Sequence, residues 1–225
     1  MTLGIPYVLG LPYGQWLSEH RAEVIGHVQE HILLAVYTII IASVLGLLIS
    51  LAVYRRVSIS TVTISLAATG FTLPSVALFG ILFSLVGGSL LAIFPPLVLY
   101  ALLPIVRNSI VGLQNVDPNI LDAARGMGMG RFRMLWQIEL PMAWPVIVAG
   151  LRVSTQLTVG IVTIAAFVKG IGMGVYAFDA LDNLGSTNTG NEAITCVIFV
   201  IAIALVFDAI WVVIRRLTTP RGSHA

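Results

Sequence analysis

Two long stretches without Asp, Glu, Lys or Arg constrain this chain more than any other feature of its sequence. One covers the 24 residues from His31 to Tyr54, and the other covers the 50 residues from Val57 to Val106. A membrane-spanning helix requires about 20 predominantly apolar residues. Over the whole chain only 10% of residues are charged, against about 25% in a soluble domain. The sequence therefore predicts an all-α integral membrane protein.

Five membrane-spanning helices account for the apolar segments. The first uncharged stretch holds one span, and the second holds two because Gly87, Gly88 and Ser89 mark a turn inside it. Apolar character resumes twice beyond a polar stretch, interrupted only by Arg152 and Asp208. The predicted spans, which together make a five-span domain over residues 31–216, are residues 32–54, 62–86, 90–106, 143–168 and 193–214.

The placement of positive charge predicts the orientation of these spans. Only Arg21 and Lys169 fall on one side of the alternating segments. The opposite side holds Arg55, Arg56, Arg107, Arg125, Arg131, Arg133, Arg215, Arg216 and Arg221. Because the cytoplasmic side carries the excess of Lys and Arg, we expect the N-terminus outside and the C-terminus in the cytoplasm. Residues 1–30 are then an extracytoplasmic segment without the pattern of a cleavable signal peptide, and residues 217–225 are a cytoplasmic tail.

Small residues and prolines mark particular helix faces. Span one carries Ala42, Gly46 and Ser50 at four-residue spacing, and span four carries Gly150, Ser154 and Thr158. Such faces let helices approach closely, either within the bundle or between subunits. Prolines remove backbone donors and are expected to kink or break spans two and three; they are Pro74, Pro95, Pro96 and Pro104.

The polar connection between spans three and four, residues 107–141, carries a helical pattern. Asp117 is a good N-cap residue and Pro118 suits the first helical position. The apolar residues that follow at near-helical spacing are Ile120, Leu121, Ala124 and Met127. We expect a short amphipathic helix across the cytoplasmic face, which on this pattern alone could simply rest on lipid headgroups.

The same connection resembles a known family. Asp122-Ala123-Ala124, three residues, Gly128, nine residues and Ile138-Glu139-Leu140-Pro141 resemble the E-A-A-x(3)-G-x(9)-I-x-L-P loop of inner-membrane permeases from binding-protein-dependent ABC importers, with Asp122 replacing Glu. The resemblance implies that Asp117 to Gly128 is a coupling helix that inserts into a groove of a cytoplasmic ATPase subunit. The residues to which it assigns ATPase coupling are Asp117, Pro118, Leu121, Asp122, Ala123, Ala124, Gly126, Gly128, Leu140 and Pro141.

Further segments are similar to the glycine betaine, carnitine and choline branch of these permeases. They are residues 71–78, 100–108, 115–118, 123–129 and 149–152. The resemblance implies a prokaryotic cytoplasmic-membrane subunit that imports a quaternary-amine osmoprotectant. It also implies a second permease subunit, two ATPase subunits that bind ATP and Mg²⁺, and a separate extracytoplasmic binding protein, with no cofactor on this chain. Related permeases with the same loop handle amino acids, which is the alternative substrate class.

Polar residues inside the spans have more than one interpretation. A polar substrate path could be lined by Thr72, Pro74, Ser75, Thr155, Gln156 and Thr158, although Ser and Thr in membrane helices often bond to their own backbone or to a neighbour. Arg152 and Asp208 lie at similar depths in consecutive antiparallel spans. We therefore expect the two side chains to form a structural ion pair. The alternatives are that Arg152 lines the substrate path, or that carbonyl groups or water bond each charged side chain separately.

Catalysis and nucleic-acid binding are not indicated. The single lysine, Lys169, cannot belong to a G-x-x-x-x-G-K-[ST] phosphate loop, and the net charge is only +2. His27 and His31 are four residues apart, but no H-E-x-x-H pattern occurs and no metal site is expected. All four histidines lie outside the predicted spans, so an intramembrane serine hydrolase is not supported. A stand-alone channel is the remaining alternative, and it would leave the loop pattern unexplained.

Overall fold

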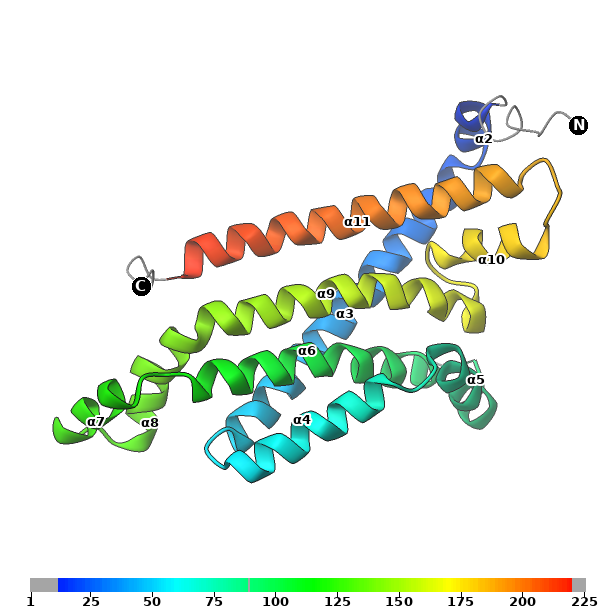
Figure 1. Cartoon of the computed structure of the whole chain (residues 1–225). Helices are drawn as coiled ribbons and strands as arrows, with labels where there is room; N and C mark the ends of the chain where they lie inside the picture. Colours follow the sequence, from blue (N-terminus) through cyan, green and yellow to red (C-terminus); the bar gives the residue numbers. More distant parts are fainter. Residues whose placement is uncertain (1–11, 89, 220–225) are drawn as a thin grey trace, which may run out of the picture. The chain divides into compact units, whose positions relative to one another are not determined.

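The computed structural model describes residues 12–88 and 90–219, and every regular element in these ranges is a helix (Figure 1). The elements are α2 (Tyr13–Glu19), α3 (Arg21–Val53), α4 (Val57–Phe71), α5 (Ser75–Val86), the 3₁₀ turn η1 (Leu90–Ala92), α6 (Phe94–Gln114), α7 (Pro118–Gly126), α8 (Arg131–Met134), the π-helical η2 (Leu135–Glu139), α9 (Leu140–Lys169), α10 (Gly174–Asp182) and α11 (Thr189–Thr218). The predictions for residues 1–11, Ser89 and residues 220–225 lie outside the described ranges.

In the described ranges, four helical segments are long and apolar enough to cross a membrane. They are Arg21–Val53, Leu90–Gln114, Arg131–Lys169 and Thr189–Thr218. They contain the predicted first, third, fourth and fifth spans. The last two extend beyond the predicted spans at both ends, the first extends only at its N-terminal end and the second only at its C-terminal end. The helices continue there into the flanking polar residues.

The predicted second span is divided into α4 and α5. Pro74 has no N–H and disfavours helical geometry at Leu73, so the chain leaves the helix there and Pro74 adopts extended geometry before α5. The hydroxyl of Tyr100 on α6 donates a hydrogen bond to the Leu73 carbonyl. Counted as one span, this pair makes five among the described residues, and otherwise there are four.

The other prolines do not break a helix. Pro95 and Pro96 occupy the first turn of α6, where the missing N–H groups would have no helical partner. Pro104 lies inside α6, which continues past it. The expected kink or break is therefore observed at Pro74, whereas α6 begins at the proline pair.

The helices fold into two compact units. The first unit contains the described residues before Ile39 together with Pro74–Leu97 and Thr158–Val206. The second unit contains Ile39–Leu73, Val98–Leu157 and the described residues from Phe207 onward. The second unit includes the whole polar connection between α6 and α9.

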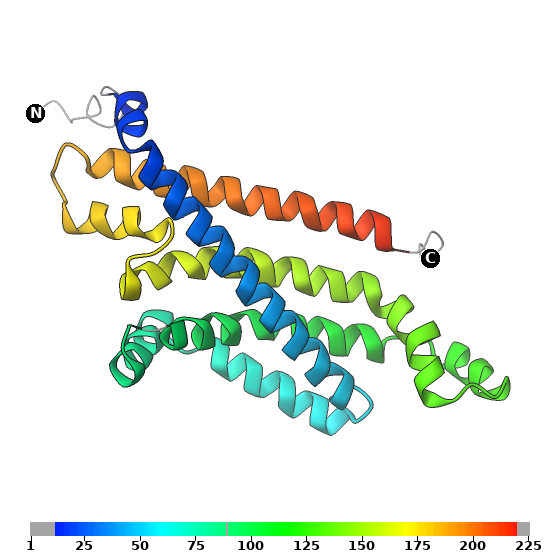
Figure 2. The ribbon, with the colours of Figure 1, turned by 180° about the vertical axis from the view of Figure 1, so that it is seen from behind.

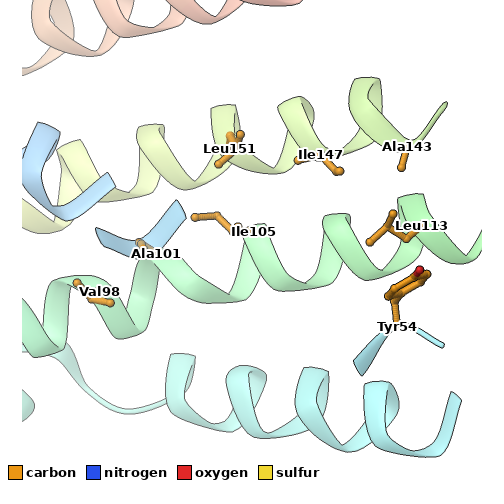
Figure 3. Close-up of a cluster of buried hydrophobic side chains, with 9 residues drawn as sticks. Tyr54, Val98, Ala101, Ile105, Leu113, Ala143, Ile147 and Leu151 are labelled. Carbon is orange, nitrogen blue, oxygen red and sulfur yellow. The ribbon is translucent and has the colours of Figure 1, made fainter. Parts of the chain in front are cut away.

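A continuous apolar cluster forms the core of the second unit (Figure 3). Its buried members are Ala42, Tyr54, Val98, Ala101, Ile105, Leu113, Ala143, Ile147 and Leu151. They come from the second-unit parts of α3, α6 and α9 and from the residue that follows α3. The α6 and α9 segments lie side by side in both views of the ribbon (Figure 1, Figure 2).

Both small-residue faces pack against α6 within the second unit. A Cβ added at Gly46 would lie 2.7 Å from the Ile105 side chain, and one added at Gly150 would lie 2.8 Å from the Pro104 carbonyl oxygen. Ser154 Oγ donates to the Ala101 carbonyl at 2.8 Å. Of the two alternatives raised by the sequence, these contacts are those of packing within the bundle.

A buried histidine organises the first unit. His31 on α3 is fully buried; its Nε2 lies 3.1 Å from the Val159 carbonyl and its Nδ1 accepts the Met173 N–H at 3.3 Å. Because Nδ1 accepts, Nε2 carries the proton and donates to Val159 in the neutral ring. Glu30 accepts the Gly172 N–H at 2.9 Å. The two side chains fix the α9–α10 connection to α3.

Candidate coupling site

The polar helix between α6 and α9 begins as its sequence predicts. The Asp117 side chain accepts the Asn119 N–H at 2.8 Å, and Pro118 is the first residue of α7. Together they satisfy one free N–H at the helix start and place a residue without an N–H where none is needed. The capped helix thus spans Pro118–Gly126, two residues shorter at its C-terminus than the predicted segment.

Gly128 terminates α7. Its N–H bonds the Arg125 carbonyl at 2.9 Å, and the next N–H, of Met129, bonds the Ala124 carbonyl at 3.0 Å. This pair of bonds is a Schellman motif, which requires a left-handed residue after the helix. Gly128 has φ +78°, and a Cβ there would have nothing within 4 Å. The glycine is therefore required for backbone conformation within this chain.

The coupling residues divide between the two faces of α7. Ala124 is fully buried within the second unit, so its side chain is not available to a partner. Asp122 and Ala123 are exposed, and Asp122 accepts a hydrogen bond from Arg125 at 2.6 Å in an ion pair exposed to solvent. Leu121 is half-buried. The interpretation that Ala124 meets an ATPase surface is replaced by a packing role, whereas Asp122 and Ala123 remain accessible.

Large apolar side chains are exposed in and just after α7. Met127 is 71% exposed and Ile120 is 38% exposed. Phe132 and Trp136, on α8 and η2, are also exposed, with ring centroids 6.1 Å apart. Ile120 and Met127 lie outside the candidate spans, and exposed apolar surface of that kind is typical of a protein interaction site.

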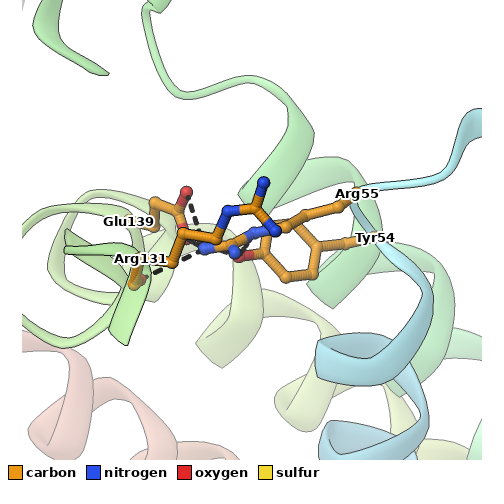
Figure 4. A network of polar contacts seen from close by, with 4 residues as sticks. All are labelled: Tyr54, Arg55, Arg131 and Glu139. Carbon is orange, nitrogen blue, oxygen red and sulfur yellow. Dashed lines mark hydrogen bonds and ion pairs between the residues drawn. The ribbon is translucent and has the colours of Figure 1, made fainter. Parts of the chain in front are cut away.

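A buried carboxylate joins the end of this connection to the end of α3 (Figure 4). Glu139 is 4% exposed and accepts the Tyr54 hydroxyl at 2.5 Å and an Arg55 Nη2 hydrogen bond at 3.1 Å. Arg55 also donates from Nε to the Tyr54 hydroxyl at 2.5 Å and from Nη2 to the Arg131 carbonyl at 3.3 Å. The charge of Glu139 is thereby neutralised and fully hydrogen-bonded, as a buried charge must be.

The remaining coupling residues lie on either side of this carboxylate. Leu140 and Pro141 begin α9 and are half-buried, and Gly126 is exposed at the end of α7. Glu139 itself was not among the predicted residues. It occupies the unspecified position of the I-x-L-P pattern, and its only signal in the sequence is a charge directly before an apolar helix.

Two of the six candidate path residues, Thr72 and Thr155, donate hydrogen bonds to nearby backbone carbonyls. Thr72 donates to the Thr69 carbonyl at 2.7 Å, where α4 ends. Thr155 is fully buried, donates to the Leu151 carbonyl and accepts the Trp211 indole N–H at 2.8 Å. Thr158 is 1% exposed. Pro74 is the N-cap of α5 and Ser75 its first residue. These placements favour structural roles for Thr72 and Thr155.

Arg152 on α9 and Asp208 on α11 lie in direct contact within the second unit. Arg152 Nε and Nη2 donate to the two carboxylate oxygens of Asp208 at 2.6 and 2.7 Å, and Gln156 Nε2 lies 3.4 Å from Oδ1. The structure thus brings together the two charges that the sequence places at similar depths. It adds Gln156, a candidate path residue, to the same group.

The described residues contain no group of three or more His, Cys, Asp or Glu side chains arranged to hold a metal ion. His27 instead lies with its Nδ1 3.0 Å from Glu30 Oε2. Burial, followed by the charges of Asp182 and Glu23, raises the pKa of Asp179 on α10.

Long apolar helices joined by a capped polar helix define a multi-span helical membrane protein. Residues 29–220 match the family described as the inner membrane component of binding-protein-dependent transport systems. The chain belongs to this family and is a permease subunit of an ABC importer.

Curated relatives agree with this assignment. The chain is 30% identical to the choline transport system permease protein OpuBB of Bacillus subtilis, over 93% of this chain and 95% of the relative. It is 28% identical to the glycine betaine/carnitine/choline transport system permease protein OpuCB of the same organism, over 92% and 94%. It is 30% identical to the osmoprotectant import permease protein OsmW of Salmonella typhimurium, over 86% and 90%.

Solved structures show the same fold. A chain of the MetNI methionine ABC transporter in an inward-facing conformation superposes with a TM-score of 0.76 at 18% identity, covering 92% of this chain and 98% of that chain. At this identity the similarity concerns the fold alone.

Proposed function

We propose that this permease subunit forms the translocation path for a quaternary-amine osmoprotectant. The observation that carries the proposal is that its curated relatives, at 28 to 30% identity over most of the chain, are named for choline, glycine betaine, carnitine or osmoprotectant transport. The solute is delivered by a separate extracytoplasmic binding protein, as expected for the family.

In this proposal α7 is the coupling helix. Its exposed side, with Ile120, Asp122, Ala123 and Met127, enters a groove on a cytoplasmic ATPase subunit. The chain itself is not catalytic, and ATP and Mg²⁺ are bound by the ATPase subunits. Each chain supplies one coupling helix while ATPase subunits act in pairs, so the complex contains two permease subunits, either identical or similar.

The proposed orientation places residues 1–30 outside the cytoplasmic membrane and residues 217–225 inside. Cysteine labelling tests it directly. The native Cys196 is 4% exposed and gives little background. A membrane-impermeant maleimide should label Asn183→Cys in intact cells and should label Asn119→Cys only after permeabilisation. The reverse pattern would contradict the orientation and the coupling role of α7 together.

The substrate is tested in the complete complex reconstituted with its ATPase subunits and binding protein. Glycine betaine, choline or carnitine should stimulate ATP hydrolysis and uptake, and methionine should not. Stimulation by amino acids alone would instead support the alternative substrate class. Solute flux without ATP hydrolysis would support a channel.

Coupling is tested by charging the exposed side of α7. Met127→Glu places a charge on a side chain that is 71% exposed and should reduce co-purification of the ATPase subunit. Leu217→Glu is the matched control, because Leu217 is 80% exposed at the end of α11. Equal co-purification of both variants would contradict the docking role of α7.

A further inference from the structure

A cavity of about 600 Å³ opens in the second unit beside the coupling helix. It lies among the end of α3, the end of α6, α7 and the α8–η2 segment. Its charged lining residues are Arg55, Arg56, Arg125, Arg131 and Glu139. Four guanidinium groups thus share the cavity with a single carboxylate.

The carboxylate does not neutralise the cavity. Glu139 is already bonded by Arg55 and the Tyr54 hydroxyl, so its charge is taken up by one of the four arginines. Arg125 pairs with Asp122 where both side chains are more than 60% exposed, and such a pair is weak in water. Within the described residues, the side chains of Arg56 and Arg131 make no hydrogen bond or ion pair. The cavity therefore keeps an excess of positive charge that no acidic side chain among the described residues neutralises.

The cavity lies at the level where apolar surface ends. Arg55 and Arg56 stand between the last residue of α3, Val53, and the first residue of α4, Val57, whose side chain is 71% exposed. In the proposed orientation this level is the cytoplasmic boundary of the membrane, and the inference rests on that orientation. Headgroup phosphates lie at this level, and the cytoplasmic leaflet carries the anionic lipids.

We propose that this cavity binds the phosphate group of an anionic membrane lipid. A guanidinium group can bind two phosphate oxygens with two parallel, charge-assisted hydrogen bonds. An ammonium group lacks this planar two-bond geometry. The volume is within the usual range for a small-molecule site, about 300 to 1,000 Å³. Arg56 and Arg131 contact the phosphate, while the Glu139 network holds Arg55 and the Arg131 backbone in place. The lipid thereby braces the coupling helix against the membrane boundary.

The experiment uses the whole complex with its ATPase subunits. The complex is reconstituted in vesicles of phosphatidylcholine with equimolar phosphatidylglycerol, re-extracted at fixed ionic strength and weighed by native mass spectrometry. Wild type should retain phosphatidylglycerol on the permease subunit. Arg56→Gln/Arg131→Gln should reduce retention about 30-fold, since each arginine near an anionic surface contributes about fivefold. Arg107→Gln/Arg216→Gln, which removes two exposed arginines outside the cavity, should not.

Two further arms keep the result interpretable. Arg56→Lys/Arg131→Lys keeps both charges without the planar guanidinium group and should give intermediate retention of the lipid. This variant provides a test if the glutamine variant folds poorly. Saturating inorganic phosphate should not displace the lipid from wild type; displacement would reassign the cavity to free phosphate. Equal lipid retention by the cavity and control variants would overturn the proposal. Loss of ATPase subunits at normal lipid retention would instead indicate an acidic protein partner and would also overturn it. Each of these outcomes leaves the solute-stimulation test of the proposed function unaffected.

Discussion

Arg152 of α9 and Asp208 of α11 form a paired, two-bond contact, with N–O distances of 2.6 and 2.7 Å. Their side chains are nevertheless 38% and 32% exposed, so the contact is at the surface of the second unit and not in its core. Charged groups within a membrane span avoid lipid and face protein or a water-filled cavity. Each of the two charges within the spans therefore has an opposite charge as its direct partner.

A double-mutant cycle tests whether the pair is structural. Arg152→Ala and Asp208→Ala should each lower the melting temperature of the purified complex, because each leaves a charge without its partner. The double variant should lose less than the sum of the single losses. Additive losses would contradict a structural pair. Normal melting temperatures combined with reduced uptake would assign Arg152 to the substrate path.

The buried carboxylate at the end of η2 gives a second prediction. Arg55→Met leaves Glu139 without its cation and should lower the free energy of unfolding by about 1 to 3 kcal/mol, a modest value because the Arg55 side chain is 39% exposed. Arg56→Met is the matched control, since the Arg56 side chain has no hydrogen bond or ion pair within the described residues. Thermal unfolding in a zwitterionic detergent separates the two. Equal stability of the variants would show that the network contributes nothing.

Local signals explain what the sequence could predict about this protein. The spans follow from the length of apolar stretches, and the start of α7 follows from Asp117 and Pro118, whose effects act within one helical turn. The contact between Arg152 and Asp208 is favoured by their similar depths, since consecutive antiparallel helices can bring such residues together. None of these requires knowledge of how distant segments pack.

Long-range packing explains what the sequence could not predict. Glu139 bonds to Tyr54, 85 residues away in the chain, and no local pattern connects them. The burial of Ala124 depends on which side of a nine-residue helix faces the second unit, and an alanine fits either side. His31 bonds to Val159 and Met173 only because the α9–α10 connection returns to α3.

Two glycines on α9 make a matched test of helix packing. A Cβ at Gly150 would lie 2.6 Å from Asn108 Cβ and 2.8 Å from the Pro104 carbonyl oxygen, whereas one at Gly160 would have nothing within 4 Å. Gly150→Ala should therefore destabilise the protein by about 1 to 3 kcal/mol. Gly160→Ala should be neutral, or stabilising by up to about 1 kcal/mol. Chemical unfolding of the two variants measures the contrast, and equal effects would argue against the close approach of α6 and α9.

The left-handed glycine after α7 separates backbone conformation from contact. Asparagine tolerates the left-handed region and valine does not, so Gly128→Asn should couple nearly normally. Gly128→Val should strain the Schellman motif by about 1 to 2 kcal/mol and reduce the ratio of uptake to ATP hydrolysis. The space around the missing Cβ is open within this chain. Equal loss with both substitutions would point to a partner surface packed against Gly128.

Adjacent alanines of α7 distinguish its inner and outer sides. Ala124 is fully buried in the second unit, and Ala123 beside it is exposed. Ala124→Leu should overfill the packing beneath α7 and destabilise the isolated permease subunit by about 1 to 3 kcal/mol. Ala123→Leu should leave the isolated subunit unchanged, because its side chain projects to solvent, and should weaken association with the ATPase subunit. Melting of the isolated subunit and co-purification of the ATPase subunit are measured on both variants. The opposite result would be intact association in Ala123→Leu and lost association at normal stability in Ala124→Leu. That result would show that Ala124, and not Ala123, faces the ATPase subunit.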